Sequence, residues 1–126
     1  MTSEETGSVP VDLEGFRQEL AEVGVEEILW GVVETFVNDA PSRMEAIDSA
    51  LQSGDNEQIR TAAHAYKSAA GTMRARELAA LLLELETAGG ERDLDRALAL
   101  QAAIRDAHER ALEFLADATE AGEGDA

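Results

Sequence analysis

The sequence predicts an all-α protein, an up-and-down antiparallel four-helix bundle with a short extra N-terminal helix. Three observations lead to this fold class. Ala and Leu dominate the apolar residues, and β-branched and aromatic residues are few, which favours helices. Apolar positions recur at helical spacing, and no alternating Val- or Ile-rich run indicates a strand. The connections between the predicted helices are short, so consecutive helices should be antiparallel neighbours.

The chain of 126 residues is long enough for one domain with a single core. We expect the bundle to occupy residues 11–118. The segments 1–10 and 119–126 are polar, contain glycine and are expected to be disordered tails.

The first half of the bundle contains two or three helices. Asp12 is the expected N-cap of a short first helix that ends near Gly24. A second helix carries the apolar stripe of residues 28–37. Pro41 then either starts a new helix or kinks a long one, which ends at residues 53–55.

Three helices are expected in the second half. Asp55 is the predicted N-cap of a helix over residues 56–70. A further helix should cover residues 75–87, and the last one residues 94–118.

The strongly acidic composition excludes several classes of function. The net charge of −17 argues against nucleic acid and against anionic membrane surfaces, because both require a basic surface. The absence of cysteine excludes disulfides, thiolate metal sites and cysteine nucleophiles. No apolar run approaches the roughly 20 residues of a membrane span, and the N-terminal segment resembles no secretory signal. We therefore expect a soluble, cytoplasmic protein, and a monomer rather than a dimer.

His64 is the first candidate functional residue. With about 100° of rotation per residue and Ile59 as the core direction, His64 points about 140° away, towards solvent. Ser68 and Gly71 flank it on this outer face, and Lys67, the only lysine of the chain, lies towards its edge. The predicted surface therefore combines an exposed imidazole, a cation and small neighbouring side chains.

The charge around His64 is opposite to that of the whole chain. Residues 60–76 contain no acidic side chain and four basic ones, namely Arg60, Lys67, Arg74 and Arg76. A positive cluster suits an imidazole that carries a negatively charged group for part of its cycle. The alternative interpretation is an ordinary surface histidine on a solvated basic face.

The other candidate sites are weaker. His108 lies about 40° from the core direction that Ile104 sets on its helix, so we expect a packed, structural histidine. Neither histidine has a second ligand at metal-binding spacing, and metal binding is not expected. There is no glycine-rich phosphate loop, so we expect no ATP binding. A hydrolase that uses Ser68 with His64 is the weakest alternative, because no oxyanion hole or nucleophile elbow is evident.

The run HAYKSAAGTMRARELAALLLELE resembles the signature of histidine phosphotransfer (HPt) domains of two-component phosphorelays. It contains a histidine, a lysine three positions later, glycine and small residues, and then a Leu-x-x-Leu-x-x-x-Leu-Glu helix. The matching residues are His64, Lys67, Ser68, Ala69, Gly71, Leu78, Leu81, Leu85 and Glu86. The preceding stretch FVNDAPSRMEAIDSALQSGDNEQIRTAAH also resembles the family, and the likeness covers residues 11–117.

The resemblance implies that the protein is a phosphohistidine carrier and not an enzyme with its own kinase machinery. His64 would accept a phosphoryl group from the aspartyl phosphate of a receiver domain and pass it to another receiver, and Lys67 would stabilise that group. Arg60, Ser68, Gly71 and Arg74 would form the docking surface. The implied partners are response-regulator receiver domains and a hybrid histidine kinase. No cofactor is expected on this chain, because the receiver domain supplies the Mg²⁺.

The chain departs from the family pattern at two positions. Ser68 replaces the glycine that commonly follows the lysine, and its hydroxyl is a minor obstruction that is able to hydrogen-bond the phosphate. Arg74 occupies a turn position where glycine is frequent, and it either adds affinity for the phosphate or the partner or narrows the choice of receiver.

One alternative of a different class stays open, a non-phosphorylated module that binds and sequesters a receiver or another regulator. Leu83 falls roughly opposite Leu81 on its helix and is a candidate exposed contact for such docking. We expect a free-standing carrier, and a domain of a hybrid sensor kinase is the alternative.

Overall fold

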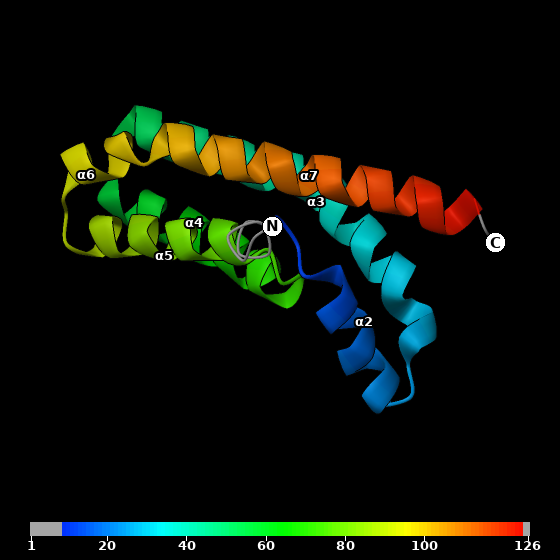
Figure 1. The fold of residues 1–126 in the computed structure, drawn as a ribbon. Helices are drawn as coiled ribbons and strands as arrows, with labels where there is room; N and C mark the ends of the chain where they lie inside the picture. The colour runs from blue at the N-terminus through cyan, green and yellow to red at the C-terminus, as the bar shows by residue number, and fades with distance from the viewer. Residues whose placement is uncertain (1–8, 125–126) are drawn as a thin grey trace, which may run out of the picture.

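The computed structural model describes residues 9–124, and it confirms the predicted all-α bundle (Figure 1). No strand occurs within these residues. The elements are α2 (Leu13–Glu22), a 3₁₀ turn η1 (Glu26–Ile28), α3 (Leu29–Ser53), α4 (Asn56–Thr72), α5 (Arg76–Gly90), α6 (Leu94–Ala99) and α7 (Gln101–Gly124).

Four long helices, α3, α4, α5 and α7, make up the bundle. Helices α4 and α5 form a close antiparallel hairpin, α3 packs on α4, and α7 contacts both α3 and α5. In Figure 1 the beginning of α3 extends beyond this hairpin and meets α2, whereas the short α6 lies at the opposite end. None of the helices in the described part of the chain is long and apolar enough to cross a membrane.

The core of the bundle is a continuous apolar cluster. On α4 it contains Ile59, Ala63, Tyr66 and Ala70, which recur at helical spacing, together with Met73 just after the helix. The ring of Tyr66 is fully buried and lies 6.2 Å from that of Phe36 on α3, centroid to centroid. This burial fixes which side of α4 faces solvent.

Local sequence explains the ends of α4 and the close packing of α5. The side chain of Asp55 accepts hydrogen bonds from the backbone N–H groups of Glu57 and Gln58 at 3.0 and 3.2 Å, as an N-cap does. Gly89 allows α5 to approach this end of α4, because a Cβ there would lie 2.9 Å from the backbone nitrogen of Arg60. The prediction of an N-cap at Asp55 is confirmed.

The structure differs from the sequence prediction at two helices. Helix α3 runs through Pro41, so this residue does not start a new helix. The single last helix predicted for residues 94–118 is divided into α6 and α7 at Leu100, whose N–H group bonds the carbonyl of Ala97 in a tight turn. The sequence around Leu100 contains no glycine or proline that signals this break.

The predicted disordered tail at residues 119–126 is wrong for residues 119–124. Helix α7 continues to Gly124, and its last turns lie beside α3, where Thr119 and Glu120 line a groove together with Trp30. The backbone of Gly122 lies so close to the Trp30 ring that a Cβ at this position would collide with it. The tail predicted for residues 1–10 lies outside the described residues, apart from its last two positions.

Candidate functional site

His64 lies on the solvent-facing side of α4, as helical spacing predicts. Its side chain is 61% exposed, and Arg60, Ser68 and Gly71 are exposed on the same helix. A Cβ added to Gly71 would meet no atom within 4 Å, so the surface after the histidine is open. An approaching protein therefore has access to the imidazole from this side.

A carboxylate on the neighbouring helix connects His64 with Lys67. Oε2 of Glu86 on α5 lies 3.0 Å from Nδ1 of His64, and Oε1 of Glu86 lies 2.7 Å from Nζ of Lys67. The contact with Lys67 and the hydrogen bond with His64 outweigh partial burial and hold the pKa of the Glu86 carboxyl below its usual range. Glu86 is therefore ionised at neutral pH.

This contact determines which tautomer the imidazole adopts. An ionised carboxylate only accepts hydrogen bonds, so the proton of neutral His64 resides on Nδ1. The lone pair of the neutral ring is then on Nε2. An exposed imidazole with a free Nε2 and an anchored Nδ1–H group is suited to nucleophilic attack, because the carboxylate stabilises the positive charge that develops on the ring.

The four cations of residues 60–76 do not form one open cluster. Arg60 pairs with Glu57 on its own helix at 2.8 Å, and Lys67 pairs with Glu86. The other two arginines turn towards the N-cap of α2, where Arg74 and Arg76 approach the carboxylate of Asp12 at 3.2 and 3.3 Å. Lys67 is thus the cation that shares a carboxylate with the histidine.

Arg74 contributes to anchoring α2 on the bundle. In addition to its contact with Asp12, its guanidinium lies 3.0 Å from Oε1 of Glu19 on α2. The backbone N–H of Asp12 also donates to the carbonyl of Arg74 at 3.0 Å. Arg74 has a φ of 62°, a left-handed conformation that glycine adopts most easily.

Sequence reasoning did not assign a role to Glu86, although the residue belongs to the quoted motif. The signal is present in the sequence, because His64 and Glu86 lie eleven positions before and after Ala75 in the turn between α4 and α5. In an antiparallel helical hairpin, residues at equal distance from the turn lie side by side. Lys67 lies three positions after His64, on the same face of α4, and therefore also reaches the Glu86 carboxylate.

His108 is buried, as predicted, and is only 6% exposed. Its Nδ1 lies 2.6 Å from the hydroxyl of Tyr66, and the two rings meet edge to face. Burial raises the pKa of Tyr66 well above its usual range, so the phenol stays protonated and is able to donate to Nδ1 of the His108 ring. This pair connects α7 to α4 from inside the bundle.

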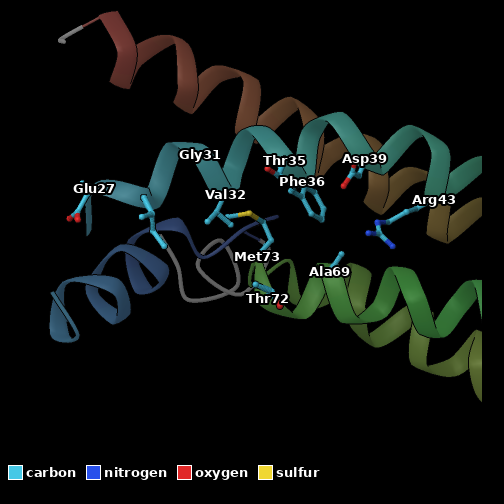
Figure 2. A pocket seen from close by; sticks show the side chains of 11 residues that line it. Glu27, Gly31, Val32, Thr35, Phe36, Asp39, Arg43, Ala69, Thr72 and Met73 are labelled. Atoms are coloured by element: carbon cyan, nitrogen blue, oxygen red, sulfur yellow. The ribbon is translucent and has the colours of Figure 1, made fainter. Parts of the chain in front are cut away.

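A groove of about 540 Å³ runs between the first half of α3 and the end of α4 (Figure 2). Val32, Phe36 and Met73 contribute to its apolar wall, and Ala69 and Thr72 line it from α4. Arg43 lies at one end of the lining and Glu27 at the other in Figure 2. The groove thus adjoins the helix that carries His64.

Comparison with known proteins agrees with this fold. Residues 31–118 match the family model of the Hpt domain, so the chain belongs to the Hpt domain family. The crystal structure of histidine-containing phosphotransfer protein B (HptB) from Pseudomonas aeruginosa PAO1 is similar, with a TM-score of 0.76 and 29% sequence identity. The match covers 87% of this chain and 95% of that chain. A comparison with curated proteins gives no significant match.

Membership of this family defines the general role of the chain. It has a histidine phosphotransfer role in two-component phosphorelays, in which Hpt domains interact with receiver domains. Hpt phosphotransfer proteins carry phosphate and are not kinases.

Proposed function

We propose that this protein is a phosphorelay intermediate that carries the phosphoryl group on Nε2 of His64. The ring nitrogen attacks the phosphorus of a receiver's aspartyl phosphate in line with the bond to the leaving carboxylate. A P–N bond forms while the P–O bond to the aspartate breaks, and the carboxylate leaves with the electron pair. The reverse step transfers the phosphoryl group to the aspartate of a second receiver.

The observation that carries this proposal is the contact between His64 and Glu86. Attack by neutral imidazole leaves a positive charge on the ring, and the Glu86 carboxylate, 3.0 Å from Nδ1, compensates it. The proton stays on Nδ1 throughout, so no separate general base is needed.

Lys67 and the small residues have supporting roles. Lys67 contacts the same carboxylate as His64, so its ammonium lies near the imidazole. Its side chain is 28% exposed, which leaves the ammonium accessible to the phosphoryl oxygens that it stabilises. Ser68 and Gly71 leave room for the active site of the receiver, which supplies Mg²⁺ and its carboxylates, and exposed Arg60 borders the same face. Arg74 contributes to docking by holding α2 in place.

The test is phosphotransfer from a receiver domain that carries radiolabelled phosphate on its aspartate, with Mg²⁺ present. The wild-type chain should become labelled, and the label should be stable to base and labile to acid. His64→Gln should remove all labelling, whereas His108→Asn should retain it. Labelling of His64→Gln at the wild-type rate would exclude His64 as the acceptor.

A second candidate function is a module that binds a receiver and sequesters it without phosphorylation. The observation in its favour is Leu83, a 51% exposed leucine on α5, the helix that also carries Glu86. The His64→Ala variant distinguishes the two functions in the cell. A sequestering module keeps its biological activity in this variant, and a phosphoryl carrier loses it.

A further inference from the structure

Arg43 has an unusual environment for a cation in so acidic a protein. Its side chain extends from α3 into the groove towards α4, where Nη1 makes a long hydrogen bond of 3.5 Å with the carbonyl of Ala65 (Figure 2). Its Nε is buried and has no hydrogen-bond partner within residues 9–124. The guanidinium is therefore partly desolvated and incompletely bonded.

The other cations show how exceptional this is. Of the ten Lys and Arg residues, eight pair with a carboxylate in the described part of the chain, which leaves two, Arg43 and Arg92. Arg92 is exposed in the turn between α5 and α6, so its guanidinium is accessible to water. Asp39 lines the groove one turn before Arg43, yet no ion pair joins the two.

A partly buried guanidinium without a counterion favours binding of a carboxylate. Removing a charge from water is costly unless an opposite charge compensates it, and the planar guanidinium bonds a carboxylate through two parallel hydrogen bonds. The groove around Arg43 is largely apolar, which strengthens such a pair. The chain thus presents a site for an acidic side chain flanked by apolar ones.

We propose that Arg43 pairs with a carboxylate side chain of the receiver domain when that domain docks on α4 and that this pair contributes to partner choice. The inference rests on the phosphotransfer role proposed above. The groove adjoins the surface around His64 through two residues of α4. Ala65, next to His64, contacts Arg43 through its carbonyl group. Ala69, next to Ser68, lines the groove.

The geometry separates this role from stabilisation of the phosphoryl group. His64 contacts α5 through Glu86, whereas Arg43 reaches α4 from α3. Arg43 should therefore affect how tightly the receiver binds and not how fast the bound phosphoryl group moves. An ion pair across an interface also steers the approach of the partner, which makes binding sensitive to salt.

The experiment compares Arg43→Gln with Arg92→Gln, a matched change at the other arginine without a counterion. The donor is a receiver domain with labelled aspartyl phosphate, and its concentration is varied at low and high salt. Arg43→Gln should raise the half-saturating receiver concentration about tenfold at low salt and leave the maximal rate unchanged. High salt should reduce this difference, Arg43→Lys should restore part of the affinity, and Arg92→Gln should behave as wild type.

Two results would overturn the inference. One is a half-saturating concentration for Arg43→Gln that equals that of Arg92→Gln, with circular dichroism showing both variants folded. The other is a lower maximal rate at an unchanged half-saturating concentration, which would place Arg43 at the reacting group. Failure of the proposed function is recognised separately, because wild-type protein would then accept no label from the receiver or from phosphoramidate, a small phosphoryl donor.

Discussion

Oε2 of Glu86 lies 3.0 Å from Nδ1 of His64, although the two residues belong to different helices. This contact connects the chemistry of the exposed imidazole to the packing of the α4–α5 hairpin. It keeps the proton on Nδ1 and leaves Nε2 as the nucleophile. Any change that separates the two helices should therefore also change the reactivity of His64.

Replacement of Glu86 by Gln should slow phosphotransfer from a receiver on the order of tenfold, because the amide lacks the charge that compensates the imidazolium. Glu86→Ala should be slower still, since the hydrogen bond to Nδ1 is then lost as well. Single-turnover transfer at saturating receiver measures this effect. Glu84→Gln, an exposed carboxylate on the same helix, is the matched control. Equal rates for Glu86→Gln and Glu84→Gln would contradict the role of Glu86.

The pair of Tyr66 and His108 makes stability depend on pH. Burial is the main cause that lowers the pKa of His108 below the ordinary value of a histidine, about 6.5, so the folded state favours the neutral ring. For a histidine with a depressed pKa, the unfolded chain binds the extra proton first. The stabilisation is complete above about pH 6.5 and is lost as the pH falls, by at most about 1.4 kcal/mol per pH unit for one proton.

We therefore expect the free energy of unfolding of the wild type to decrease between pH 7.5 and pH 5.5. His108→Asn keeps a hydrogen-bond acceptor for Tyr66 but does not titrate, so its urea unfolding should vary less over this range. The difference between the pH profiles of the two proteins removes contributions from groups common to both. The same pH dependence in His108→Asn as in the wild type would assign the effect to another group.

Gly89 is required for the close approach of α5 to α4. A Cβ at Gly89 would lie 2.9 Å from backbone atoms of Asn56 and Arg60, so Gly89→Ala should lower the free energy of unfolding. Crowding of a packed interface costs about 1–3 kcal/mol. At Gly90 a Cβ would meet the flexible side chain of Arg60 at 3.6 Å, and Gly90→Ala should be neutral or stabilising by up to about 1 kcal/mol. Urea unfolding measures the free energy of unfolding of both variants. Equal values for Gly89→Ala and Gly90→Ala would contradict the close packing of α4 and α5 at Gly89.

Features that depend on one helix alone could be predicted from the sequence. The helical rotation from Ile59 on α4 predicted the exposure of His64, and Ile59 is buried as assumed. Asp55 marked the start of α4 because its side chain bonds the next N–H groups of the same chain segment.

Features that depend on contacts between helices could not be predicted in this way. The contact of Glu86 with His64 requires the register of two helices, and the ion pairs of Arg74 require the position of α2. The end of α7 is helical and packs near Trp30 on α3. The glycine-rich sequence of this segment alone indicates disorder, so its helical structure could not be predicted without the contact between the two helices.

The most direct test of the account is to identify the phosphorylated atom. The chain, labelled with ¹⁵N in its histidines, is phosphorylated by a receiver domain and observed by NMR under mildly basic conditions. We predict coupling between phosphorus and Nε2 of His64, with the signals of His108 unchanged. Phosphate on Nδ1 of His64, on the hydroxyl of Ser68 or on His108 would contradict the mechanism that the contact between His64 and Glu86 supports.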